Sequence, residues 1–179
     1  MKRYLVAILM VGAAGVMLWD FFIVPRPLAG FAVFDPQNAT YEIRGAHVVL
    51  KNGNAEAPAA PGSASKISTR YFGNVAEGDL NGDGAPDMAF LITQETGGSG
   101  LFYYVVTALA DPSGYKATPA FYVGDRIAPQ STEIDANLRE LRINYAERKP
   151  DEPMATQPSV GTTLYLKVTP AGLLEGIMK

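Results

Sequence analysis

Residues 87–93 read DMAFLIT and residues 101–109 read LFYYVVTAL. Both runs are rich in β-branched and aromatic side chains, and the glycine-rich segment between them (TGGSG, residues 96–100) is typical of a flexible turn. We therefore expect the two runs to pair as the central antiparallel hairpin of the fold. Because side chains alternate along a strand, the triplet FYY at residues 102–104 places aromatic rings on both faces. The hairpin is then either covered on both sides or leaves one face as an interface.

Further short apolar runs flank this hairpin, each bounded by Gly, Pro, Asn or Asp. They are residues 41–44, 46–50, 65–71, 118–123, 140–145 and 162–168. Outside the N-terminus no segment keeps a 3.6-residue period long enough for a helix. Many short strands with frequent turns predict an all-β domain, either an antiparallel sandwich or a bent sheet or partial barrel. A small-residue connector (PAAPGSAS, residues 58–65) and a long proline-containing loop (residues 146–161) interrupt the strands.

Composition narrows the class of protein. The chain has 179 residues, of which 47% are hydrophobic and 18% charged, so we expect it to fold as one domain with an appendage. It contains no cysteine, which excludes a disulfide framework, a thiol nucleophile and a Cys-ligated metal centre. A net charge of −3 argues against a nucleic-acid partner, because phosphate contacts require a concentrated basic patch.

The N-terminus carries a candidate membrane span. From Tyr4 to Val24 the sequence reads YLVAILMVGAAGVMLWDFFIV, with Asp20 as its only charge. As a helix this segment would be about 31 Å long, close to the thickness of the bilayer hydrocarbon core. The cations Lys2 and Arg3 precede it, which predicts a cytoplasmic N-terminus and a main domain on the periplasmic or extracellular side of a bacterial cytoplasmic membrane.

The predicted division is therefore a cytoplasmic stub and signal anchor at residues 1–27 and an extracytoplasmic β domain at residues 28–179. Pro25 and Pro27 end the helix, because proline lacks the N–H that continues it. A cleaved secretory signal peptide is the alternative, since it has the same order of charge and apolar residues. The anchor is favoured because the apolar run is longer than the usual apolar core of a signal peptide, about 7 to 15 residues, and no clear A-x-A cleavage site follows it.

Residues 79–87 read DLNGDGAPD and form the one motif that points to chemistry. Asp79, Asn81 and Asp83 occupy alternate positions, so their side-chain oxygens converge when the backbone coils tightly. Gly82 and Gly84 permit that coil because they adopt positive φ without steric cost. Carboxylates this close repel one another unless a cation or protons intervene. The spacing therefore predicts a cation site.

The second half of the loop completes the predicted ligand shell. Ala85 offers a backbone carbonyl, and Asp87 closes the shell directly or through water. Hard oxygen ligands without His or Cys suit Ca²⁺, and Phe90 stands where an EF-hand requires Glu. We expect structural calcium, because a saturated oxygen shell leaves no open position for a reacting water. The alternative is a metal-free turn, since Asn, Asp and Gly favour turns by themselves.

This loop resembles the calcium loops of FG-GAP propeller blades and dockerin-type repeats. The resemblance implies the same ligand set, which is Asp79, Asn81, Asp83, Ala85 and Asp87. It covers nine residues without internal repetition, so it implies neither a propeller nor a dockerin fold. More widely, RYFGN, GDLNGDG, TGGSG followed by FYYVV, GDRIAPQ and NYAERKPDEPM resemble a family of small bacterial extracytoplasmic proteins of unassigned activity. That resemblance covers most of the exposed domain and implies no mechanism.

Three function classes are compatible with these features. The favoured one is a non-catalytic accessory subunit of a larger membrane complex, such as a photosynthetic or respiratory assembly. The second is a free-standing anchored or secreted binding module for a cell-envelope ligand, whose surface we expect in the loops at residues 124–130 and 146–161. The weakest is a hydrolase using carboxylates such as Asp125 and Glu133. The only histidine, His47, lies on a strand with its side chain expected in solvent, and no nucleophile turn accompanies it, so we expect no enzyme.

Overall fold

The structure, a computed structural model, describes residues 34–179. Every regular element among these residues is a β-strand, so the predicted all-β class is confirmed. The strands are β1 (Thr40–Ile43), β2 (Ala46–Val49), β3 (Asn54–Pro58), β4 (Lys66–Gly78), β5 (Asp87–Glu95), β6 (Phe102–Asp111), β7 (Gly114–Ala117), β8 (Phe121–Asp125), β9 (Ala128–Asp135), β10 (Glu140–Glu147), β11 (Val160–Val168) and β12 (Leu174–Gly176).

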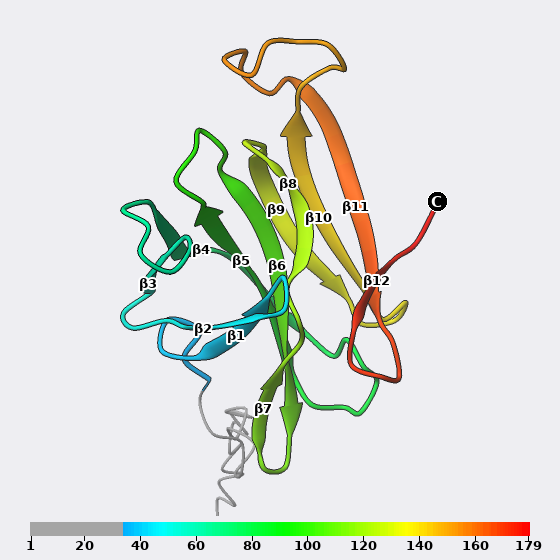
Figure 1. Ribbon diagram of the computed structural model, residues 1–179. Helices are drawn as coiled ribbons and strands as arrows, with labels where there is room; N and C mark the ends of the chain where they lie inside the picture. The colour runs from blue at the N-terminus through cyan, green and yellow to red at the C-terminus, as the bar shows by residue number, and fades with distance from the viewer. Residues whose placement is uncertain (1–33) are drawn as a thin grey trace, which may run out of the picture.

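The strands form three antiparallel sheets, of which the largest is central. It has the order β3-β4-β5-β6-β7, with β8 also paired to β6, and it curls into a half-barrel. A second sheet, β12-β11-β10-β9, covers one side of it, and the β1–β2 hairpin lies on the other (Figure 1). The predicted central hairpin is confirmed, because β5 pairs with β6 and Leu91 stands opposite Val105.

Two hydrophobic cores lie on the two faces of the central sheet, as the alternation along β5 and β6 requires. Leu91, Tyr103 and Val105 face the β9–β12 sheet, whereas Phe90 and Tyr104 face the β1–β2 hairpin. The aromatic rings therefore lie on both faces, as expected, and other strands cover each face. Continuous burial from Ala89 to Ile92 results from this three-layer arrangement, since each successive side chain enters one core or the other.

Several strand boundaries differ from the prediction. The predicted strand at residues 65–71 extends to Gly78, because bulges near Gly73 let β4 bend and continue along β5. The predicted strand at 118–123 begins only at Phe121, after Pro119, which has no N–H for a ladder. Strands β3, β7, β9 and β12 have no counterpart among the predicted strands; they are short or rich in polar residues, and a Pro occurs in β3 and in β9.

The predicted membrane span at residues 4–24 lies outside the described residues. Within residues 34–179 no helix is long and apolar enough to cross a membrane. The chain enters the described domain at Phe34, whose ring lies 5.4 Å from that of Tyr115 on β7. In Figure 1 this entry lies in the lower part of the domain, as does the 79–87 loop.

Several connections between strands lie at two opposite ends of the domain. The loop end comprises the 79–87 loop, the β9–β10 turn (residues 136–139) and the β11–β12 turn (residues 169–173), all in the lower part of Figure 1. The tip end comprises the connections at residues 96–101, 126–127 and 148–159, at the top of the same view.

Candidate metal centre

The 79–87 loop joins β4 to β5 and is anchored in the core by a buried leucine. Leu80 is fully buried in the core that faces the β9–β12 sheet. Gly82 and Gly84 both have a φ of 84°, which is the left-handed backbone that the predicted coil requires. The glycines therefore stand where only glycine adopts the conformation without strain.

Side-chain oxygens at alternate positions bind the backbone of this coil. Asp79 accepts hydrogen bonds from the N–H groups of Gly82 (2.5 Å) and Gly84 (3.0 Å). Asn81 Oδ1 accepts from Asp83 N–H, and Asp83 Oδ1 accepts from Ala85 N–H, both at 2.8 Å. The loop is thus wound around the oxygens of Asp79, Asn81 and Asp83, and these three predicted residues share one coil.

Asp87 has a different environment, because it is buried behind the loop. One of its oxygens accepts hydrogen bonds from the N–H groups of Leu80 (2.9 Å) and Asn81 (3.2 Å), and the other accepts from Ala110 on β6 (2.8 Å). Burial raises its pKa above the ordinary value, while the three N–H donors act in the opposite direction. Asp87 therefore ties the loop to the central sheet from inside.

No ion pair among the described residues balances the negative charges of Asp79 and Asp83. Five ion pairs occur within residues 34–179, and neither Asp79 nor Asp83 takes part in any of them. Over the same residues, no three acidic or His side chains converge into a ready-made metal cluster. The donor set still fits calcium, because it consists of carboxylate and amide oxygens on a glycine-permitted coil. Calcium at this loop stays a prediction.

Arg139, in the β9–β10 turn, lies against the loop backbone. A Cβ added to Gly82 would collide with its guanidinium group, so only glycine admits this approach. Nearby, a cavity of about 460 Å³ is lined by residues that include Leu80, Asn81, Arg139 and Lys167. The sequence alone does not identify these two cations, because each lies far from the loop along the chain and neither belongs to a motif.

At the tip end, Asp125 organises a second charged cluster. Its carboxylate forms an ion pair with Arg126 at 2.7 Å and accepts a hydrogen bond from Leu101 N–H at 2.9 Å. The hydrogen bond from Arg126 holds the pKa of Asp125 below its usual range. The end of the β5–β6 connection is thus bound to the β8–β9 connection.

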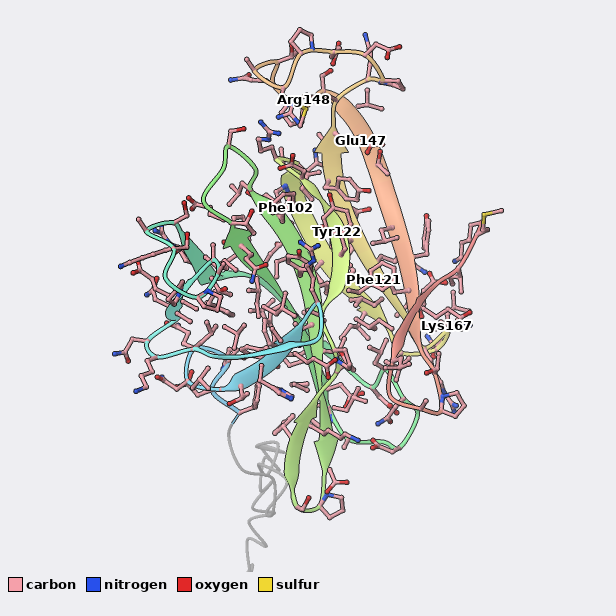
Figure 2. The ribbon with its side chains drawn as sticks, in the orientation of Figure 1. Phe102, Phe121, Tyr122, Glu147, Arg148 and Lys167 are labelled. Atoms are coloured by element: carbon pink, nitrogen blue, oxygen red, sulfur yellow. The ribbon has the colours of Figure 1, made fainter. Side chains whose placement is uncertain are left out.

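Arg148 binds the 148–159 connection to this cluster. Its guanidinium donates to the Thr156 carbonyl at 2.6 Å and to the Arg126 carbonyl at 3.0 Å. Figure 2 shows Arg148 and Glu147 directly beneath the 148–159 loop. A cavity of about 420 Å³ lies here, lined from both segments that the sequence singled out, with Asp125 and Arg148 among its walls.

The carboxylates proposed for hydrolysis are held by separate partners. Asp125 is engaged by Arg126 and Leu101 N–H, whereas Glu133 accepts hydrogen bonds from Ser131 and Asn144. His47 is exposed on β2, as the alternation predicted.

Comparison of the chain with protein-family models, with curated proteins and with solved structures gives no match.

Proposed function

We propose that this protein is a non-catalytic accessory subunit, anchored in a bacterial cytoplasmic membrane by residues 4–24, with an extracytoplasmic β domain that structural calcium stabilises. The observation that carries the calcium proposal is the 79–87 loop. There, Asp79 and Asp83 share one coil, and neither has an ion-pair partner among the described residues. A bound cation offsets the repulsion between them.

Asp79, Asn81 and Asp83 would hold the ion with side-chain oxygens, and Ala85 with its carbonyl. Asp87 would act as a support, since its carboxylate is buried behind the loop and accepts a hydrogen bond from Ala110 of the central sheet. Such a site links β4 to β5 and stabilises the fold without a disulfide. It supplies no catalytic step.

Thermal unfolding of the full-length chain in detergent tests the calcium proposal. Calcium at 100 times its Kd should stabilise the protein by about 2.7 kcal/mol relative to excess chelator. The double variant D79N/D83N should lose this stabilisation, and D125N, which removes a carboxylate at the other end, should keep it. An unchanged midpoint in calcium for the wild-type chain would contradict a structural site.

Gentle detergent extraction from the native membrane tests the subunit proposal. On a native gel, the chain should migrate within a larger assembly whose components mass spectrometry identifies. Migration as a lone 19 kDa species would contradict it.

A second candidate, a binding module for a cell-envelope ligand, is favoured by the tip cavity. Its walls carry both charge signs, and Tyr122 is half-exposed beside them. Pull-down of envelope fractions with the wild-type chain and with R148A separates the two candidates. A ligand retained by the first and lost by the second favours the module.

A further inference from the structure

We infer that the loop end of the β domain docks on the surface of an anionic bilayer, with the cavity beside the 79–87 loop receiving a lipid phosphate. The inference rests on the proposed membrane anchor. It adds a second membrane contact, made by the folded domain.

Chain geometry keeps the domain close to the membrane. From Val24 to Phe34 the backbone spans at most about 35 Å, because an extended residue advances about 3.3–3.6 Å. Phe34 packs on Tyr115, and the Tyr115 hydroxyl donates to the Pro86 carbonyl in the loop (3.4 Å). The point at which the chain enters the domain is therefore adjacent to the loop end, and a short tether holds this end nearest the bilayer.

Two cations at this end are available to an anionic ligand. Arg139 and Lys167 both line the cavity of about 460 Å³, and neither takes part in an ion pair within residues 34–179. By contrast, Arg126 at the tip is paired with Asp125. Figure 2 places Lys167 toward the lower end of β11. A phosphate group between two such cations has the complementary charge.

Exposed leucines flank the cavity. Leu138 in the β9–β10 turn is 49% exposed, and Leu173 in the β11–β12 turn is 47% exposed. Asp135 accepts hydrogen bonds from the N–H groups of Asn137 and Leu138 (both 3.1 Å), which fixes the first turn. Apolar side chains on turn tips beside free cations are suited to the bilayer interface, where the leucines enter the acyl boundary and the cations meet headgroups.

Asp79 and Asp83 lie at the same end and would repel an anionic surface. The calcium proposed at their loop removes this repulsion. Docking should therefore be stronger in calcium than in chelator.

The absence of cysteine from the sequence allows a direct test on the full-length chain. Single variants L138C, L173C and M154C, the last a matched exposed site in the tip-end loop, are labelled with an environment-sensitive fluorophore. They are then reconstituted in calcium into vesicles of phosphatidylglycerol or of phosphatidylcholine that contain a spin-labelled quencher lipid. Labels at 138 and 173 should be quenched in phosphatidylglycerol, and the label at 154 should not. Adding R139Q/K167Q should shift the docking equilibrium by about 30-fold, because each surface cation contributes about fivefold.

The outcomes separate this inference from the proposed anchor. If the chain does not float with vesicles, the anchor fails and the docking fails with it. If it floats while labels at 138 and 173 stay unquenched, the anchor stands and the docking is overturned. Labels unquenched in vesicles but shielded in native membranes would assign this face to a protein partner, which also overturns the lipid proposal. Quenching that R139Q/K167Q leaves unchanged would overturn the role of the cavity.

Discussion

The tip end and the loop end of this domain differ in the groups that hold the negative charge of their carboxylates. At the tip, Asp125 is paired with Arg126, and Arg148 ties the neighbouring connections together through carbonyl oxygens. At the loop end, Asp79 and Asp83 are held by the N–H groups of their own coil, and no ion pair within residues 34–179 includes them.

Backbone N–H groups orient a carboxylate but carry no net positive charge, whereas a guanidinium does both. The charge of Asp125 at the tip is therefore balanced by Arg126, whereas Asp79 and Asp83 have no ion-pair partner within residues 34–179. Arg139 and Lys167 lie near enough to line the adjacent cavity, yet neither pairs with the loop. This difference supports the proposal that the loop end takes a cation from solution.

The largest effect should come from Asp87→Ala, measured in chelator so that calcium does not contribute. The substitution leaves three backbone donors without their acceptor, two of them at the buried Leu80 and Ala110, and should cost about 3 kcal/mol or more in unfolding free energy. Denaturant unfolding followed by the near-UV signal of the tyrosines measures it. Glu95→Ala removes an exposed carboxylate from the other end of β5 and should change stability by less than about 0.5 kcal/mol. Equal costs for both variants would refute the supporting role of Asp87.

Gly82→Ala and Gly84→Ala form a matched pair for the coil. Both residues have a φ of 84°, so each substitution should cost about 1–2 kcal/mol in strain. A Cβ at Gly84 meets nothing within 4 Å, whereas one at Gly82 collides with Arg139, whose flexible side chain must then move away. The pair should match in stability and differ in lipid docking, which only Gly82→Ala should weaken. Calorimetric melting and the quenching assay distinguish the two, and identical docking would argue against a role for Arg139.

The smallest effect should come from Asp125→Asn at the tip, at about 1 kcal/mol, because the pair with Arg126 is partly solvated. The pKa of Asp125 is lower in the folded state than its ordinary value of 3.8. Its contribution is therefore present at neutral pH and declines as the pH falls below about 3.8. Urea unfolding should separate variant and wild type at pH 7 and bring them together near pH 2. A cost that persists in acid would show that packing, and not charge, holds the tip.

Much of the fold could be predicted from local pattern. The runs at residues 87–93 and 101–109 are apolar on both faces, which predicts that they are the central strands of a sheet. The glycines at 97, 98 and 100 indicate the turn between them. Strand β9 was not predicted, because Pro129 and its polar neighbours interrupt the alternation of apolar and polar residues. In the structure, the pairing register of β9 with β10 shifts at Tyr145, which accommodates Pro129. Its pairing depends on β10, which sequence alone does not reveal.

The candidate site could likewise be predicted from the sequence only in part. The coil formed by Asp79, Asn81 and Asp83 follows from spacing, because its contacts lie within a few residues. The inward turn of Asp87 toward Ala110 and the approach of Arg139 to Gly82 depend on how the sheets stack. Those contacts bring together residues far apart in the chain, and no local pattern encodes them.

Isothermal titration of calcium into the full-length, chelator-treated chain in detergent tests the central claim most directly. We expect one saturable site that D79N/D83N abolishes and D125N retains, because Asp79 and Asp83 have no ion-pair partner within residues 34–179, whereas Asp125 is paired with Arg126. Absence of binding to the wild-type chain, or binding that survives D79N/D83N, would contradict it.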